Sequence, residues 1–90
     1  ENVTLARLYF NKAVGREDYG KTSNTEEEKI ERYGQAYDNY KKAFLLMRKL
    51  FGPEHATVKR YRDKLAEPTY AWLADDREED VDSLQYNPTS

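Results

Sequence analysis

Apolar side chains recur at alternating intervals of three and four residues along the segment 25–51. They are Ile30, Tyr33, Tyr37, Tyr40, Phe44, Met47 and Phe51. This period places them on one face of an α-helix, and Thr25 followed by Glu28 has the spacing of a helix-capping box. The segment therefore predicts one long helix whose apolar stripe other helices must cover, with Gly34 allowing another helix to approach closely.

A second apolar stripe at helical spacing predicts a helix over residues 2–14. We expect Gly15 to end this helix, because glycine favours the residue after a helix C-terminus. Two glycines and a Thr-Ser-Asn cluster predict a loop over residues 15–24. The first helix would then lie beside the long helix as one arm of a hairpin.

The Gly52-Pro53 pair predicts the end of the long helix and the start of a third, because glycine closes helices and proline opens them. The third helix should run from about Pro53 to Glu67, with Pro68 breaking it. A short helix or helical continuation follows, with Trp72 packing on the bundle. No segment alternates with the period of a strand. The predicted fold is all-α, an antiparallel helical hairpin plus a third helix, with three to four helices in total.

The composition changes at Asp75, after which acidic side chains surround a single arginine. This pattern is typical of a solvated, disordered segment. We therefore expect a helical interaction domain over residues 1–74 and an acidic, disordered tail over residues 75–90. Lysine and arginine dominate residues 41–64, and one hypothesis is that the acidic residues 75–82 fold back onto this basic stretch.

The sequence lacks residues that several kinds of catalytic and metal-binding site require. The 90 residues include one histidine, His55, and no cysteine. A thiolate zinc site and a disulfide scaffold are therefore excluded, and no catalytic partner is placed beside His55. We therefore expect that the protein is not an enzyme and that it binds neither a cofactor nor a metal. His55 should instead pack at the corner between two helices. No apolar run is long enough to span a membrane, and we expect a cytoplasmic protein.

The long helix and the turn after it carry a known sequence pattern. The pattern comprises Tyr33, Ala36, Tyr37, Tyr40, Ala43 and Phe44, then Phe51-Gly52-Pro53-Glu54-His55, then Leu65-Ala66. It resembles a tetratricopeptide repeat (TPR) of the kinesin light chain type, in which two helices flank a Leu-Gly-Pro-x-His turn. The chain departs from that family over residues 15–32, which are longer than the repeat period allows. Such repeats also normally need three or more copies to bury their faces.

A second resemblance covers more of the chain, but each of its sequence motifs is less specific. Its first helix would end in Lys12-Ala13-Val14, followed by Glu17-Asp18-Tyr19-Gly20, and its third helix has basic residues before Leu65. These pieces look similar to the microtubule-interacting and trafficking (MIT) domain, a stand-alone bundle of three helices. Both resemblances imply the same kind of function, which is binding a short peptide segment of another protein.

The function predicted from these patterns is a non-enzymatic protein–protein interaction module, a TPR-like helical scaffold that captures a peptide. The alternatives are an MIT-like adaptor in membrane trafficking and a helical element that oligomerises through the long stripe. The basic stretch favours an acidic protein or peptide as the partner. A homo-oligomer is an alternative. Nucleic acid is not favoured as a partner, because the net charge of the chain is −2. Polar residues of the first and third helices should flank one groove, and the candidate partner-binding residues are Arg7, Asn11, Lys12, Arg60 and Lys64.

Overall fold

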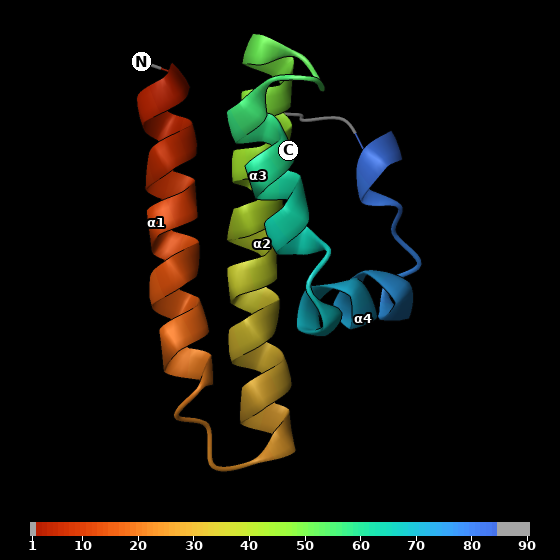
Figure 1. Cartoon of the computed structure of the whole chain (residues 1–90). Helices are drawn as coiled ribbons and strands as arrows, with labels where there is room; N and C mark the ends of the chain where they lie inside the picture. Colours follow the sequence, from red (N-terminus) through yellow and green to blue (C-terminus); the bar gives the residue numbers. More distant parts are fainter. Residues whose placement is uncertain (1, 85–90) are drawn as a thin grey trace.

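The computed structural model describes residues 2–84 of the chain (Figure 1). Within this range it contains four α-helices, α1 (Asn2–Gly20), α2 (Glu26–Phe51), α3 (Ala56–Leu65) and α4 (Pro68–Asp76), and a short 3₁₀ turn, η1 (Val81–Ser83). No strand occurs over residues 2–84. The all-α prediction is confirmed.

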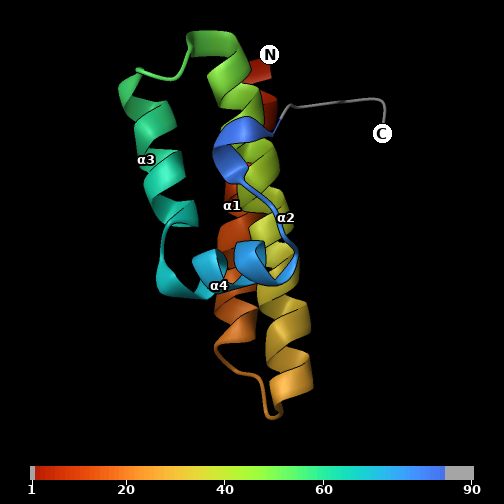
Figure 2. The same cartoon turned by 90° about the vertical axis from the view of Figure 1, so that its right-hand side faces the viewer.

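The helices are arranged around α2, which runs the whole length of the molecule. α1 packs along α2 in the opposite direction, and α3 returns along α2 on another side (Figures 1 and 2). α4 lies across the middle of α2, and the chain then turns upward along α2 to η1 (Figure 2). The predicted hairpin with a third helix is therefore present, and α4 adds a fourth, crossing helix.

The ends of α2 follow from local chemistry. The Thr25 hydroxyl caps the helix by accepting a hydrogen bond from the Glu28 amide at 3.1 Å. The Glu28 carboxylate accepts from the Asn24 amide at 2.9 Å, one residue before the partner that a standard capping box predicts. At the other end, Gly52 has a φ of 86°, and its amide donates to the Arg48 carbonyl. The positive φ explains why glycine occupies this position.

The core is aromatic and is centred on the middle of the predicted stripe. Tyr37, Tyr40, Phe44 and Met47 are buried, whereas Ile30 is 46% exposed and Phe51 is 45% exposed. The central part of the stripe is thus core, and its two ends reach the surface. The helices α1 and α2 approach closely because small, fully buried residues line their contact: Ala6, Ala13, Ala36 and Ala43.

The contact between α1 and α3 is made by aromatic rings. The Phe10 ring stacks on the Tyr61 ring with a centroid distance of 4.4 Å, and it meets the Tyr40 ring edge-on at 5.1 Å. Aromatic pairs in these geometries contribute about 0.5–1.5 kcal/mol beyond their buried area. Tyrosine and phenylalanine therefore supply much of the packing in a chain that has few aliphatic residues.

Two helix boundaries predicted from glycine and proline are wrong. α1 does not end at residue 14 but continues to Gly20, so Gly15 lies inside a helix and only a short loop remains before α2. Gly20 is buried, and a Cβ there would lie 3.1 Å from the Tyr33 ring. The third helix begins at Ala56 with His55 as its N-cap, so Pro53 belongs to the turn that precedes it.

The C-terminal part of the chain also differs from the prediction. The expected boundary at Asp75 falls inside α4, and residues 77–84 lie against α2 instead of forming a free tail (Figure 2). The remainder of the predicted tail, residues 85–90, lies outside the described residues. The close neighbour of Gly34 is a side chain from the C-cap residue of α4, Arg77. A Cβ at Gly34 would lie 3.1 Å from an Arg77 guanidinium nitrogen, so the glycine makes room for that side chain.

Candidate peptide-binding surface

One side of α2 holds the chain's own residues 79–84, which we call the acidic segment. Glu79 begins the contact: its carboxylate accepts a hydrogen bond from the Tyr37 hydroxyl at 2.8 Å and one from the Lys41 ammonium at 3.0 Å. Tyr37 and Lys41 lie one helical turn apart on α2, which lets both donors reach the same carboxylate. This pair of donors fixes one end of the acidic segment.

Arginine side chains fix the other end of the acidic segment. Arg48 of α2 donates to the main-chain carbonyl of Asp82 at 3.0 Å and also to the carbonyl of Leu84. Arg62 of α3 forms an ion pair with the Asp82 carboxylate at 3.9 Å. Because two of these contacts are to main-chain oxygens, the surface binds the backbone of the 3₁₀ turn and of the residue after it as well as acidic side chains.

Apolar side chains contribute between these polar contacts. Val81 and Leu84 are partly buried and pack against the hydrophobic core. Asp80 shapes the chain between them, because its carboxylate accepts from the Asp82 amide at 3.1 Å and caps η1. The acidic segment is thus held by alternating acidic and aliphatic contacts.

The charges of this surface change the ionisation of Glu79 and Tyr37. Burial alone raises the pKa of Glu79, but hydrogen bonds from Tyr37 and Lys41 and the nearby positive charges outweigh burial and hold the pKa below 4.5. Burial and the hydrogen bond to Glu79 raise the pKa of Tyr37 above its ordinary value. At neutral pH Glu79 is therefore ionised and Tyr37 is a neutral donor.

A second polar cluster joins the helices on the other side of the core. The Glu17 carboxylate of α1 accepts from the hydroxyls of Tyr70 at 2.5 Å and Tyr40 at 3.3 Å, and it pairs with the Lys64 ammonium at 3.1 Å. Burial raises the pKa of Glu17, but these hydrogen bonds and the Lys64 charge hold it below 4.5. Every partner belongs to a different helix, so this cluster is a structural junction.

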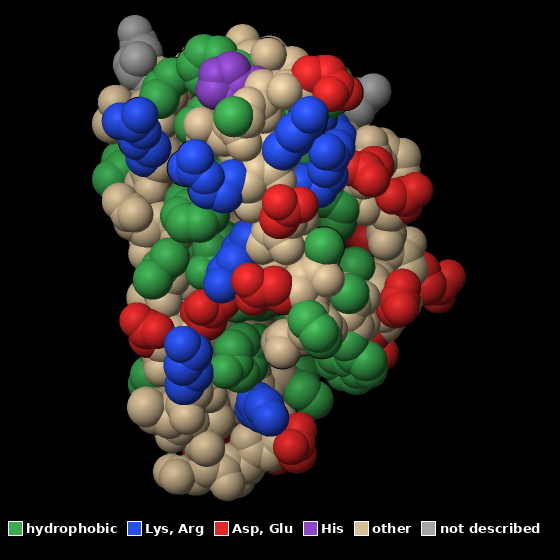
Figure 3. Space-filling model, viewed as in Figure 1, with side chains coloured by type: hydrophobic (Ala, Val, Ile, Leu, Met, Phe, Trp, Pro, Cys, Tyr) green, Lys and Arg blue, Asp and Glu red, His purple; other side chains and the backbone are tan. Residues whose placement is uncertain are grey.

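The structure does not bring the five predicted binding residues together. Lys64 is held by Glu17 and Glu67, and Lys12 lines a shallow groove formed by α1 and α2 alone. Arg7 and Arg60 are exposed. Burial raises the pKa of Tyr61, and the charges of Arg7 and Arg60 partly oppose this rise, so both side chains lie near the Tyr61 hydroxyl. Asn11 is exposed on α1. Figure 3 shows the face that contains α1 and α3, where lysine and arginine side chains gather mainly in the upper half, and acidic side chains lie at the centre and right.

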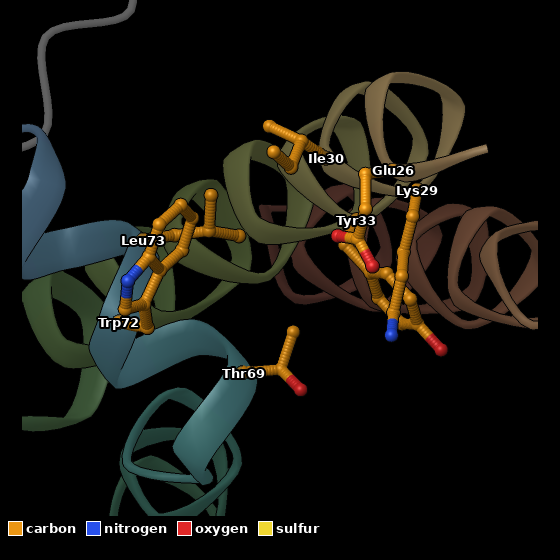
Figure 4. Close-up of a pocket in the computed structure, with 7 residues that line it drawn as sticks. All are labelled: Glu26, Lys29, Ile30, Tyr33, Thr69, Trp72 and Leu73. Carbon is orange, nitrogen blue, oxygen red and sulfur yellow. The ribbon is translucent and has the colours of Figure 1, made fainter.

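An apolar groove lies between the first turns of α2 and the outer side of α4. It has a volume of about 220 Å³, and Figure 4 shows its walls: Glu26, Lys29, Ile30, Tyr33, Thr69, Trp72 and Leu73. The predicted packing of Trp72 on the bundle is incomplete, since the residue is 52% exposed. The signal for this groove in the sequence is the apolar stripe of α2, which extends to Ile30 beyond the core.

His55 occupies the corner between α2 and α3, in agreement with the sequence-based expectation. Its Nδ1 accepts a hydrogen bond from the Thr57 amide at 3.2 Å, and its ring stacks on the Phe51 ring at 4.6 Å. Among residues 2–84 no three side chains of the metal-binding types form a cluster. None of the helices in this part of the chain is long and apolar enough to cross a membrane.

No protein-family model, no curated protein and no solved structure matches the chain. The resemblances to the TPR and to the MIT domain therefore remain predictions. The candidate site rests on the geometry of the acidic segment and its contacts with α2 and α3.

Proposed function

We propose that the chain is a non-enzymatic protein–protein interaction module that captures a short, acidic peptide segment of a partner. The observation that supports this proposal is that α2 and α3 already hold such a segment, namely the chain's own residues 79–84. A partner peptide would replace the acidic segment and use the same donors, Tyr37, Lys41, Arg48 and Arg62.

The contacts of the acidic segment define the chemistry of the partner peptide. An acidic side chain meets Tyr37 and Lys41, and two aliphatic side chains follow in the positions of Val81 and Leu84. The main chain between them accepts from Arg48. Charged contacts of this kind give specificity and fast association, while the aliphatic side chains add affinity by burying apolar surface.

The strength of the contacts is suited to exchange between the acidic segment and a partner. The Lys41–Glu79 pair is partly exposed and Arg62–Asp82 is more exposed. Ion pairs at such positions contribute about 0.2–1 kcal/mol each. The two ion pairs are therefore weak enough to exchange with those of a partner peptide, and the attached segment lowers the apparent affinity of every competitor. An MIT-like adaptor function in the cytoplasm is compatible with this mode of binding, and it rests on the resemblance alone.

The test uses a fluorescently labelled peptide that copies residues 77–84. Two full-length chains are compared, the unchanged chain and a released variant with Val81→Asp and Leu84→Asp, which removes the apolar contacts of the attached segment. The released variant should bind the peptide about tenfold more tightly or better, because its surface is free. Ser83→Ala is the matched control in the same segment, and it should not increase binding.

A second pair of variants identifies the surface. In the released variant, Lys41→Glu together with Arg48→Glu should abolish peptide binding, whereas Lys49→Glu, at an exposed position of the same helix, should leave most of it. Binding should weaken as salt is added, because the contacts are charged. The proposal fails if neither chain binds the peptide, or if binding does not depend on Lys41 and Arg48.

A further inference from the structure

We infer that the apolar groove between α2 and α4 is the contact surface for a second copy of this chain, related to the first by a two-fold axis. This inference is independent of the proposed peptide capture, because the acidic segment and the groove share no residue. It rests on three properties of the groove: its walls expose apolar surface, its charged rim is complementary to itself, and its position leaves it open.

The groove exposes one large apolar side chain from each of its two helices. Ile30 is 46% exposed on α2 and Trp72 is 52% exposed on α4, and they stand over the better-covered side chains of Tyr33 and Leu73. Figure 4 shows Trp72 on one wall of the hollow, with Ile30 and Tyr33 on the facing side. A surface with both projecting and recessed apolar side chains can interlock with an identical surface.

The rim of the groove carries charges of both signs on a single helix. Glu26 and Lys29 lie on the first turns of α2, three residues apart, and both line the groove. A two-fold axis makes the same patch serve both partners. A contact from one residue of the first copy to a second residue of the other copy is therefore repeated with the two copies exchanged. Antiparallel approach of two α2 helices would therefore place Glu26 of each copy near Lys29 of the other.

This rim favours a second copy over a peptide of one charge. A site for an acidic or a basic peptide would carry mainly one sign, as the Lys41, Arg48 and Arg62 surface does. The α2–α4 groove instead offers one acid and one base beside apolar walls, which is neutral overall and self-complementary. Figures 1 and 2 show no described part of the chain that covers this side of α4.

Trp72 makes the inference directly measurable, because it is the only tryptophan of the chain. As protein concentration rises, the mass from sedimentation equilibrium should increase from 10.6 kDa toward twice this value. Over the same range the Trp72 emission should shift to shorter wavelength and become less accessible to quenchers. Ile30→Glu should weaken dimerisation about tenfold or more, since a buried apolar anchor becomes a charge. Leu8→Glu, at an exposed position of α1, is the matched control and should change neither measurement.

Charge exchange then tests the two-fold arrangement. Glu26→Lys alone and Lys29→Glu alone each give a rim of one sign, so each variant should be monomeric where the unchanged chain is dimeric. An equal mixture of the two variants restores both opposite-charge contacts, and it should recover the dimer mass and the Trp72 shift. Circular dichroism of each variant checks that the helices remain.

Three results would overturn the inference. The first is a monomeric mass and unchanged Trp72 emission at every concentration. The second is a dimer that forms without any response from Trp72 or Ile30→Glu, which would place the contact on another face. The third is a mixture of the two charge variants that stays monomeric. Each of these results leaves the peptide-binding test unaffected, so the two proposals can fail separately.

Discussion

The Glu17 carboxylate accepts a hydrogen bond from the Tyr70 hydroxyl at 2.5 Å, although 53 positions separate the two residues in the chain. This contact joins the C-terminal half of α1 to α4. Tyr40 of α2 and Lys64 of α3 bind the same carboxylate. One acidic side chain on α1 therefore holds a donor from each of the other three helices, which couples α4 to the rest of the bundle.

Loss of this carboxylate should destabilise the whole fold. Glu17→Ala leaves two tyrosine hydroxyls without their charged acceptor in a partly buried site, and the Lys64 ammonium keeps only Glu67 as its ion-pair partner. We expect the free energy of unfolding to fall by about 2–3 kcal/mol, measured by urea denaturation at neutral pH. Asp18→Ala, whose side chain is 67% exposed, is the neighbouring control and should cost less than about 1 kcal/mol. Equal losses from both variants would mean that the junction contributes little.

Stability should decrease in acid because of Glu17 and Glu79. Both carboxylates have folded-state pKa values below 4.5, so below that pH the unfolded chain binds protons more readily than the folded one. The stability that they contribute is complete well above pH 4.5 and is lost as the pH falls through their folded-state pKa values. Urea denaturation from neutral pH to about pH 3 should show this loss. The double variant Glu17→Gln, Glu79→Gln should have a flatter profile over that range, and Glu27→Gln should follow the unchanged chain.

The sequence predicted α2 well because several local signals agree there. The Thr25 cap, the acidic first turn, the apolar stripe and Gly52 all indicate the same helix, and the structure begins and ends it within a residue of these signals. Fold class and the order of the first three helices follow from the same kind of pattern. The geometry of His55 also agrees with its expected place at the corner.

The candidate site was predicted only in part, because it depends on contacts between distant segments. Lys41, Arg48 and Arg62 belong to the basic stretch that the sequence singled out, and the hypothesis that an acidic segment folds onto it matches the structure for residues 79–84. The sequence-based assignment of binding residues to the first and third helices was made without knowledge of their partners. Lys64 is already paired with Glu17, and no periodicity in the sequence shows that.

Gly15 was wrongly expected to end the first helix, and it lies in α1 together with Gly20. The two glycines should respond in opposite ways to substitution by alanine. Gly15 lies inside α1, and no neighbouring atom lies within 4 Å of the place that a Cβ would take, so the glycine costs helix stability and gains no packing. Gly15→Ala should raise the free energy of unfolding by about 0.5–1 kcal/mol. At Gly20 a Cβ would press on the Tyr33 ring at 3.1 Å, and Gly20→Ala should lower stability, because Tyr33 lies between Gly20 and the Tyr70 ring. Thermal unfolding of both variants checks the opposite signs.

His55 should act as a structural residue whose two contacts can be separated. His55→Ala removes the hydrogen bond that caps α3 and the stacking on Phe51, and we expect it to lower the free energy of unfolding by about 1 kcal/mol. His55→Asn removes the ring but supplies a side-chain oxygen that can accept from the Thr57 amide in place of Nδ1, so it should recover part of this loss. Urea denaturation of the three chains measures both effects. If asparagine recovers nothing, the stacking on Phe51 accounts for the whole contribution, and capping by His55 does not stabilise α3.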